Sequence, residues 1–321
     1  MIDALAAEPP VAPPEASAAA SVARVEVGPA AAAVTSRAFV LRPLTFPGGS
    51  IGELAVNSTV NVLAVAGFRA DHLVATLVLD GGLGVAEREA EVRAMARAAD
   101  EANVRLVNGE TTVVTRSRTP GLTIVTTAFG RPLDDVVIDA RAVRPGDRVL
   151  VSGPVGDHGV ALLAARGEPG LGPDVRSDTR SVAPLVEALV AAVGTGIRWM
   201  RCPTRGAAAA LAELAREAGC GVDLTDAAWP VREAVREACR RIGLDALHFA
   251  TEGQFLAVVA PDVADVAIAT LRATPGGEDA AVIGDIVELP SATVLGVTLD
   301  GASHVIDIAR AAGTGTEVGH V

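Results

Sequence analysis

The sequence predicts a mixed α/β protein (α+β, two domains), and three observations lead to this fold class. The chain has 321 residues, whereas a single domain holds roughly 100–200. Half of the residues are hydrophobic but only 2% are aromatic, so small aliphatic side chains must fill the core, as suits close-packed layers of helices and strands. Segments with strand spacing and segments with helix spacing are interspersed in both halves of the chain.

The chain is predicted to divide at an Arg-Pro-Gly-Asp turn, residues 144–147, of the kind that opens a new unit. This gives an N-terminal domain over residues 21–144 and a C-terminal domain over residues 145–321. Residues 1–20 are rich in Ala and Pro and are predicted to form a flexible arm, because their prolines oppose a helix. They lack the basic start and apolar stretch of a signal peptide.

In the N-terminal half, apolar residues near helical spacing predict a helix over residues 51–66. Residues 73–79 form a continuous apolar run that ends at Asp-Gly-Gly, which favours a buried strand. Residues 86–103 predict an amphipathic helix. Further strands are predicted at residues 22–27, 38–41, 105–107 and 122–129, with a turn over residues 43–49.

In the C-terminal half, a strand over residues 148–152 is followed by a glycine-rich loop, residues 153–159, and a helix over residues 160–166. Further helices are predicted at residues 182–193, 207–219, 231–242 and 263–273. Further strands are predicted at residues 222–224, 254–259, 281–287 and 292–299.

Composition excludes several classes of partner. A net charge of −12 argues against nucleic acid and against anionic membrane surfaces, which attract clustered Lys and Arg. No apolar run reaches the roughly 20 residues of a membrane span. The three cysteines make neither a disulfide framework nor a Cys-x-x-Cys metal motif. We therefore expect a cytoplasmic protein.

Two loops that precede helices are candidate anion sites, because backbone N–H groups at a helix N-terminus attract oxyanions. The first loop offers Gly153, Gly156, Asp157 and Gly159, and the second offers Thr204, Arg205 and Gly206. The alternative is that each loop is a tight turn that the fold requires. His158 is either a general acid/base or a hydrogen-bonded structural histidine.

Four segments together resemble the hydrogenase expression/formation protein E family, a branch of the aminoimidazole-ribonucleotide-synthetase-like superfamily. They are FPGGSIGELAVNSTVNVLA (residues 46–64), VNGETTVV (107–114), SGPVGDHG (152–159), and RCPTRGAAAALAEL (201–214) with TEGQ (251–254). The resemblance implies a synthetase-like N-terminal domain that pairs across a dimer and a C-terminal α/β domain. It also implies a cleft in which acidic residues hold Mg²⁺ and ATP. The family uses ATP to dehydrate a carboxamide on its own C-terminal cysteine, which gives a thiocyanate.

The sequence departs from the family pattern at several acidic positions. The family has Asp where this chain has Arg37, Ser50, Val62 and Cys202, and it has Gly-Asp-Thr-Lys where this chain has residues 109–112. The printed chain ends in Gly-His-Val instead of cysteine. Because Mg²⁺ needs oxygen ligands, the resemblance with these departures predicts neither a metal nor a cofactor, and no ATP hydrolysis.

The resulting prediction is an ATP-independent enzyme of specialised metabolism that acts on a small anionic substrate. One such reaction is an intramolecular cyclisation that expels sulfate or phosphate, as in aziridine-forming cyclases of antibiotic biosynthesis. Two alternatives stay open: a non-catalytic subunit that stabilises a partner, and an ATP-dependent carbamoyl dehydratase of hydrogenase maturation. We expect a homodimer or a heteromer with a pathway partner.

The candidate catalytic residues are Glu252 and Glu110 as bases, and His158. The candidate anion-binding residues are Arg37, Asn61, Thr111, Gly153, Gly156, Asp157, Gly159, Thr204, Arg205 and Gly206. Two of these residues have a simpler alternative: Glu252 is then a solvated loop carboxylate, and Arg37 is a surface arginine. Cys202 is either a nucleophile or, more often for such a residue, a small buried filler.

Overall fold

The computed structural model describes residues 22–27, 30–114, 121–133, 136–169, 171, 174–290, 292–298 and 302–306. The predicted arm, residues 1–20, lies outside the described residues. Within these ranges no helix is long and apolar enough to cross a membrane.

The N-terminal half is built on a five-stranded sheet of order β1-β2-β7-β5-β6. β5 and β6 are parallel, and the other neighbours are antiparallel. Helices α1 (Ile51–Val65) and α2 (Val85–Glu101) pack against each other, and α1 also packs on β2, β5 and β7. The strands are β1 (Ala23–Val27), β2 (Ala30–Val40), β5 (Phe68–Asp80), β6 (Arg105–Val114) and β7 (Leu122–Pro132), with a small hairpin of β3 (Thr45–Phe46) and β4 (Gly49–Ser50).

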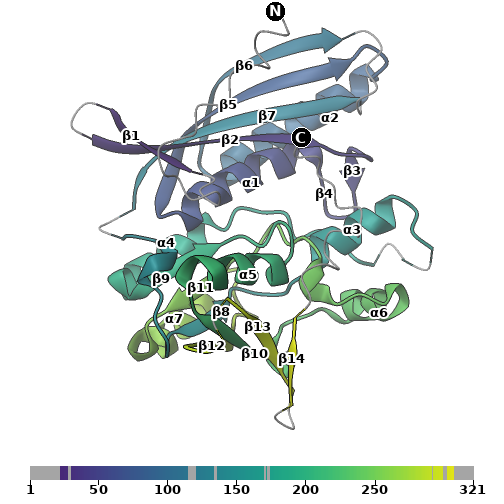
Figure 1. Ribbon diagram of the computed structural model, residues 1–321. Coiled ribbons are helices and arrows are strands. Elements are labelled where there is room, and N and C mark those ends of the chain that lie inside the picture. The colour runs from purple at the N-terminus through teal and green to yellow at the C-terminus, as the bar shows by residue number, and fades with distance from the viewer. Residues whose placement is uncertain are drawn as a thin grey trace, which may run out of the picture.

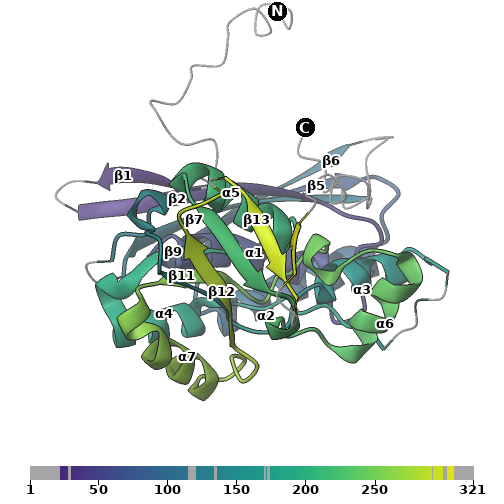
Figure 2. The same ribbon diagram turned by 60° about the horizontal axis from the view of Figure 1, so that its bottom comes forward.

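The C-terminal half is built on a seven-stranded sheet of order β14-β13-β10-β12-β8-β11-β9. Its strands are β8 (Arg148–Val151), β9 (Ile197–Arg201), β10 (Gly221–Thr225), β11 (Leu256–Val259), β12 (Ala281–Val287), β13 (Val294–Val297) and β14 (Ser303–Val305). Its helices are α3 (Asp157–Ala165), α4 (Ala183–Val193), α5 (Ala207–Ala218), α6 (Glu233–Ile242) and α7 (Ala264–Ala273). Figure 2 shows α4 and α7 together on one side of this sheet.

Helix α1 joins the two halves. It lies between the N-terminal sheet and the C-terminal half (Figure 1), and nearly all of its residues are buried. Its buried polar residues, such as Ser58 and Asn61, therefore face other parts of the protein and not solvent. Its last turn, Ala64 and Val65, shares an apolar cluster with α4, α7, β9 and β11. Arg69 on β5 and Glu187 on α4 add an ion pair across the same junction.

The predicted fold class is confirmed, but some predicted elements differ from the structure. β9 was missed, because its residues Ile-Arg-Trp-Met-Arg lack both a continuous apolar run and strict alternation. β2 and β6 are longer than predicted. β6 is an edge strand whose side chains are exposed, so burial leaves no pattern in its sequence.

Candidate active site between the two halves

A cleft of about 650 Å³ opens where β2 and the end of α1 face β9 and the loop that follows it. Arg37, Thr204 and Arg205 line this cleft, and they also line an adjoining cavity of about 60 Å³. Glu252 and His158 line the small cavity. The fold therefore brings together predicted site residues from both halves of the chain.

Glu252 is the buried acid of this site. The residue is only 7% exposed, and its Oε2 atom has no hydrogen-bond partner among the described residues. Burial raises the pKa of Glu252 to about 7, against the opposing effects of the Arg37 charge and the Ser58 hydroxyl, while the Asp178 charge raises it further. A carboxyl group that titrates near neutrality can take up and release a proton at physiological pH.

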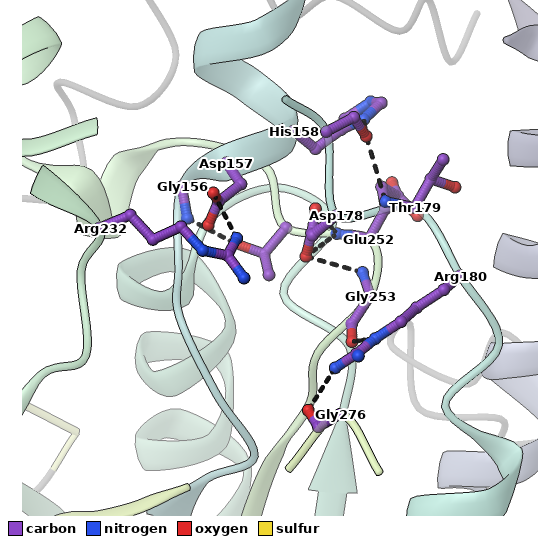
Figure 3. Close-up of polar contacts among 12 residues, drawn as sticks. Gly156, Asp157, His158, Asp178, Thr179, Arg180, Arg232, Glu252, Gly253 and Gly276 are labelled. Carbon is purple, nitrogen blue, oxygen red and sulfur yellow. Dashed lines mark hydrogen bonds and ion pairs between the residues drawn. The ribbon is translucent and has the colours of Figure 1, made fainter. Parts of the chain in front are cut away.

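The backbone around Glu252 is held on several sides (Figure 3). The Asp178 carboxylate accepts the N–H groups of Glu252 and Gly253, and the Arg180 Nε donates to the Gly253 carbonyl at 3.0 Å. From α1, the Asn61 Nδ2 donates to the Glu252 carbonyl at 3.0 Å. Asn61, expected to bind an anion, is thus only 1% exposed and joins the two halves of the protein.

The first glycine loop uses its N–H groups inside the protein. Gly156 donates to the Thr251 hydroxyl at 2.8 Å, Val155 donates to the Pro230 carbonyl, and Gly159 donates to the Ala250 carbonyl. Gly156 has φ +89°, which favours glycine, whereas Gly153 lies so close to the Gln254 side chain that a Cβ would stand 2.7 Å from it. These contacts favour the alternative interpretation, a tight turn that the fold requires.

Asp157 and His158 begin α3, and both are buried. The Asp157 carboxylate pairs with the Arg232 guanidinium at 2.6 Å (Figure 3). The His158 Nδ1 lies 2.8 Å from the Ser177 hydroxyl, and its ring meets Phe46 edge to face. Burial lowers the pKa of His158 to about 3, so the imidazole is neutral at pH 7, which favours its structural alternative.

The second loop is also bonded internally. Gly206 donates its N–H to the Pro203 carbonyl, and Thr204 donates its N–H to the Cys202 carbonyl. The Arg205 guanidinium is exposed and pairs with Glu213 on α5. Burial raises the pKa of the Cys202 thiol, so Cys202 is a neutral buried side chain and not an activated nucleophile.

Glu110 and Thr111 lie away from Glu252 within one chain. Both are exposed on β6, at the far edge of the sheet. Arg37, Thr126, Ala75 and Gly109 are register partners across β2, β7, β5 and β6. With strands about 4.8 Å apart, Arg37 and the neighbourhood of Glu110 are separated by about 14 Å. Within a single chain, Glu110 therefore does not lie beside Glu252 as a second candidate base.

Sequence reasoning missed Asp178, Arg180 and Arg232, which hold the site together. Asp178 and Arg180 lie between α3 and α4, in residues 174–182, which form neither helix nor strand. Such a segment has no periodicity, and its role follows only from the contacts that it makes after folding.

The residues around the cleft do not by themselves fit a protein-held Mg²⁺. Within the described ranges no three His, Cys, Asp or Glu side chains are grouped as a metal site. Arg37, Val62 and Cys202, which line the cleft, supply no carboxylate. Mg²⁺ is also bound through substrate phosphates, so a metal ion that enters with a nucleotide needs few ligands from the protein.

Comparison with family models matches both halves of the chain. Residues 18–131 match the AIR synthase related protein N-terminal domain, and residues 144–297 match the AIR synthase related protein C-terminal domain. Carbamoyl dehydratase HypE of Bradyrhizobium diazoefficiens is 42% identical over 85% of this chain and 80% of its own length. Carbamoyl dehydratase HypE of Escherichia coli is 37% identical over 87% of this chain and 82% of its own length.

Solved structures agree with these matches. A HypE structure in complex with ATP superposes with a TM-score of 0.83 at 36% identity, over 89% of this chain and 87% of that chain. A HypE chain in a HypE–HypF complex superposes with a TM-score of 0.82 at 36% identity, over 86% of this chain and 90% of that chain. The resemblance drawn from the sequence motifs is confirmed.

The comparisons also correct the predicted function. An ATP-independent cyclase of antibiotic biosynthesis is wrong, because relatives at about 40% identity are carbamoyl dehydratases and a similar HypE binds ATP. The prediction of a divergent ATP site has no support from them either. The departures from the family pattern are substitutions at single positions, whereas the similarity covers 85% of the chain.

Proposed function

We propose that this chain, which belongs to the HypE family of carbamoyl dehydratases, is an ATP-dependent dehydratase that acts on a carbamoyl-type carboxamide. The observation that carries the proposal is the 42% identity to a carbamoyl dehydratase over 85% of the chain. The ATP complex of a similar HypE supports the nucleotide as co-substrate.

The chemistry of such a dehydration sets what the site must do. The carboxamide oxygen attacks the γ-phosphorus of ATP, and ADP leaves. The nitrogen then gives up its protons as the C–O bond breaks, which leaves a C≡N group and inorganic phosphate that contains the former carboxamide oxygen. The site needs a base for the N–H protons and positive charge for the phosphoryl oxygens.

Glu252 and Arg37 supply these two properties. Glu252, with its pKa raised to about 7 by burial, is the proposed base. Arg37 lines the same small cavity, and its Nε has no hydrogen-bond partner among the described residues. A guanidinium is always charged and binds phosphate well. We propose that Arg37 faces the phosphoryl group while Glu252 accepts the proton.

The carboxamide is proposed to be carried by a group other than the three cysteines Cys202, Cys220 and Cys239. The three cysteines of the chain are all buried, so none is placed to carry a carboxamide. A similar HypE forms a complex with HypF, which supports a heteromer with a partner protein. A cytoplasmic location stays a prediction.

Titration calorimetry with ATP and Mg²⁺ tests the nucleotide part of this proposal. We expect saturable binding by the wild type and by Glu252→Gln, since that substitution removes a proton acceptor and keeps the cleft. The absence of binding by both proteins would overturn the proposal.

A further inference from the structure

Asp178 makes an unusual set of contacts with the backbone of the proposed base. Its Oδ1 lies 3.1 Å and its Oδ2 3.2 Å from the Glu252 nitrogen, and its Oδ2 accepts the Gly253 N–H at 2.8 Å (Figure 3). One carboxylate thus fixes two successive peptide groups. Hydrogen bonds to an ionised acceptor are about twice as strong as those between neutral groups.

The approach of the two segments is too close for any side chain at residue 253. A Cβ built on Gly253 would stand 1.8 Å from the Asp178 carbonyl oxygen. Glycine is therefore required at this position because the two backbones approach so closely. Backbone conformation is not the reason, since the φ of Gly253 is not in the left-handed region. The pair of Asp178 and Gly253 brings the loop against residues 174–182 as closely as two backbones allow.

The opposite side of the Glu252 peptide is fixed as well. The Asn61 amide holds the Glu252 carbonyl, and Thr251 donates its N–H to the Pro203 carbonyl. The Arg180 guanidinium bonds the Gly253 and Gly276 carbonyls. The backbone is therefore held by hydrogen bonds on both sides of Glu252.

From these contacts we propose that Asp178 is the positioning residue of Glu252: it orients the base through its backbone and adds a negative charge beside it. This inference rests on the proposed function only for the identity of Glu252 as base. The contacts themselves do not depend on which reaction the site performs.

Charged and polar groups from several elements surround Glu252 and Asp178. Glu252 meets Arg37 from β2, Ser58 from α1 and Cys202 at the end of β9. Asp178 meets Asp157 from α3, together with Arg180 and Arg232. Burial raises the pKa of Asp178 to about 6, so the residue is mostly ionised at pH 7.5. Removal of its charge lowers the pKa of Glu252.

Amide hydrogen exchange of the full-length protein tests the positioning without reference to activity. In Asp178→Ala, we expect exchange at the Glu252 and Gly253 amides to accelerate at least about tenfold, because both lose their acceptor. Asp178→Asn keeps one acceptor oxygen, so its exchange rates at these two amides are expected to lie between those of the wild type and Asp178→Ala. Asp174→Asn is the matched control, since Asp174 is exposed and lines, together with Asp178, a cavity of about 420 Å³. Unchanged exchange at both amides in Asp178→Ala and Asp178→Asn would overturn the proposal.

Kinetics separate positioning from general support of the fold. Asp178→Asn is expected to lower kcat about tenfold, with less than a twofold change in KM for ATP, and to move the acidic limb of the pH profile to lower pH. An unmoved limb in a folded variant would overturn the role of the charge. A wild type without dehydratase activity would instead refute the proposed function, while the exchange experiment still decides the positioning.

Discussion

The Asn61 side chain on α1 donates a hydrogen bond to the carbonyl of Glu252, at 3.0 Å, and so ties the proposed base to the other half of the protein. The same amide nitrogen donates to the Arg180 carbonyl at 2.8 Å, and its oxygen accepts the Val182 N–H at 2.7 Å. α1 carries Ser58 toward Glu252 as well. The position of the base therefore depends on how the two halves dock.

Replacement of Asn61 is expected to weaken the whole fold. Asn61→Leu leaves buried polar backbone groups without partners, which costs about 2–4 kcal/mol of unfolding free energy. Urea denaturation measures this cost. Asn108→Ala on the exposed strand β6 is the control and should stay within about 0.5 kcal/mol of the wild type. A loss below about 0.5 kcal/mol in Asn61→Leu would contradict the account of the junction.

The pH dependence of turnover should report the proposed base. Because Glu252 acts when ionised and burial raises its pKa to about 7, kcat is expected to rise with pH, with the midpoint of the rise near pH 7 and a plateau at higher pH. Glu252→Gln should remove this limb along with most of the activity. A limb that stays near pH 7 in that variant would assign it to another group.

Replacement of Arg37 should move the acidic limb of the pH profile to higher pH, opposite to the shift expected for Asp178→Asn. The Arg37 charge lowers the pKa of Glu252, so Arg37→Gln is expected to raise that pKa and shift the limb to higher pH. Steady-state rates between pH 6 and 9 measure the shift. Arg93→Gln, at an exposed arginine of α2 that pairs with Glu89, serves as control and should leave the limb in place.

Stability should fall as pH rises through neutrality. Glu252 and Asp178 have pKa values raised to about 7 and about 6 by burial, so each contributes stability that is complete below its unfolded pKa and lost as pH rises through its folded pKa. Glu252→Gln is therefore expected to gain about 2–3 kcal/mol over the wild type at pH 8 and almost nothing at pH 4. Equal stability differences at both pH values would disprove this linkage.

The parts of the fold that periodicity marks were predictable. α1 and α2 follow apolar spacing, and β5 follows a continuous apolar run, so local pattern and burial agree there. Only the first residues of β6 were predicted as a strand, because an exposed edge strand has no buried face and so no alternating apolar pattern. Of the site, Glu252 was found through its motif, whereas Asp178 lies in an irregular segment.

The function of individual loops was harder to predict than their presence. The glycine loop was identified, but a sequence does not show that Gly156 donates to Thr251 and Gly159 to Ala250. The same holds for Asn61, whose amide suits an anion and a domain junction equally well. Partners that lie far away in sequence decide between such uses.

The most direct test of an ATP-dependent dehydratase is the stoichiometry of its products. The protein would be mixed with ATP, Mg²⁺ and a short peptide that carries an S-carbamoyl cysteine, and ADP and peptide mass would be followed together. We predict one thiocyanate peptide, 18 Da lighter by loss of water, for each ADP formed, and no thiocyanate peptide with Glu252→Gln. The account would be contradicted if the carbamoyl peptide kept its mass when mixed with ATP, HypF and a preparation of this protein that binds ATP.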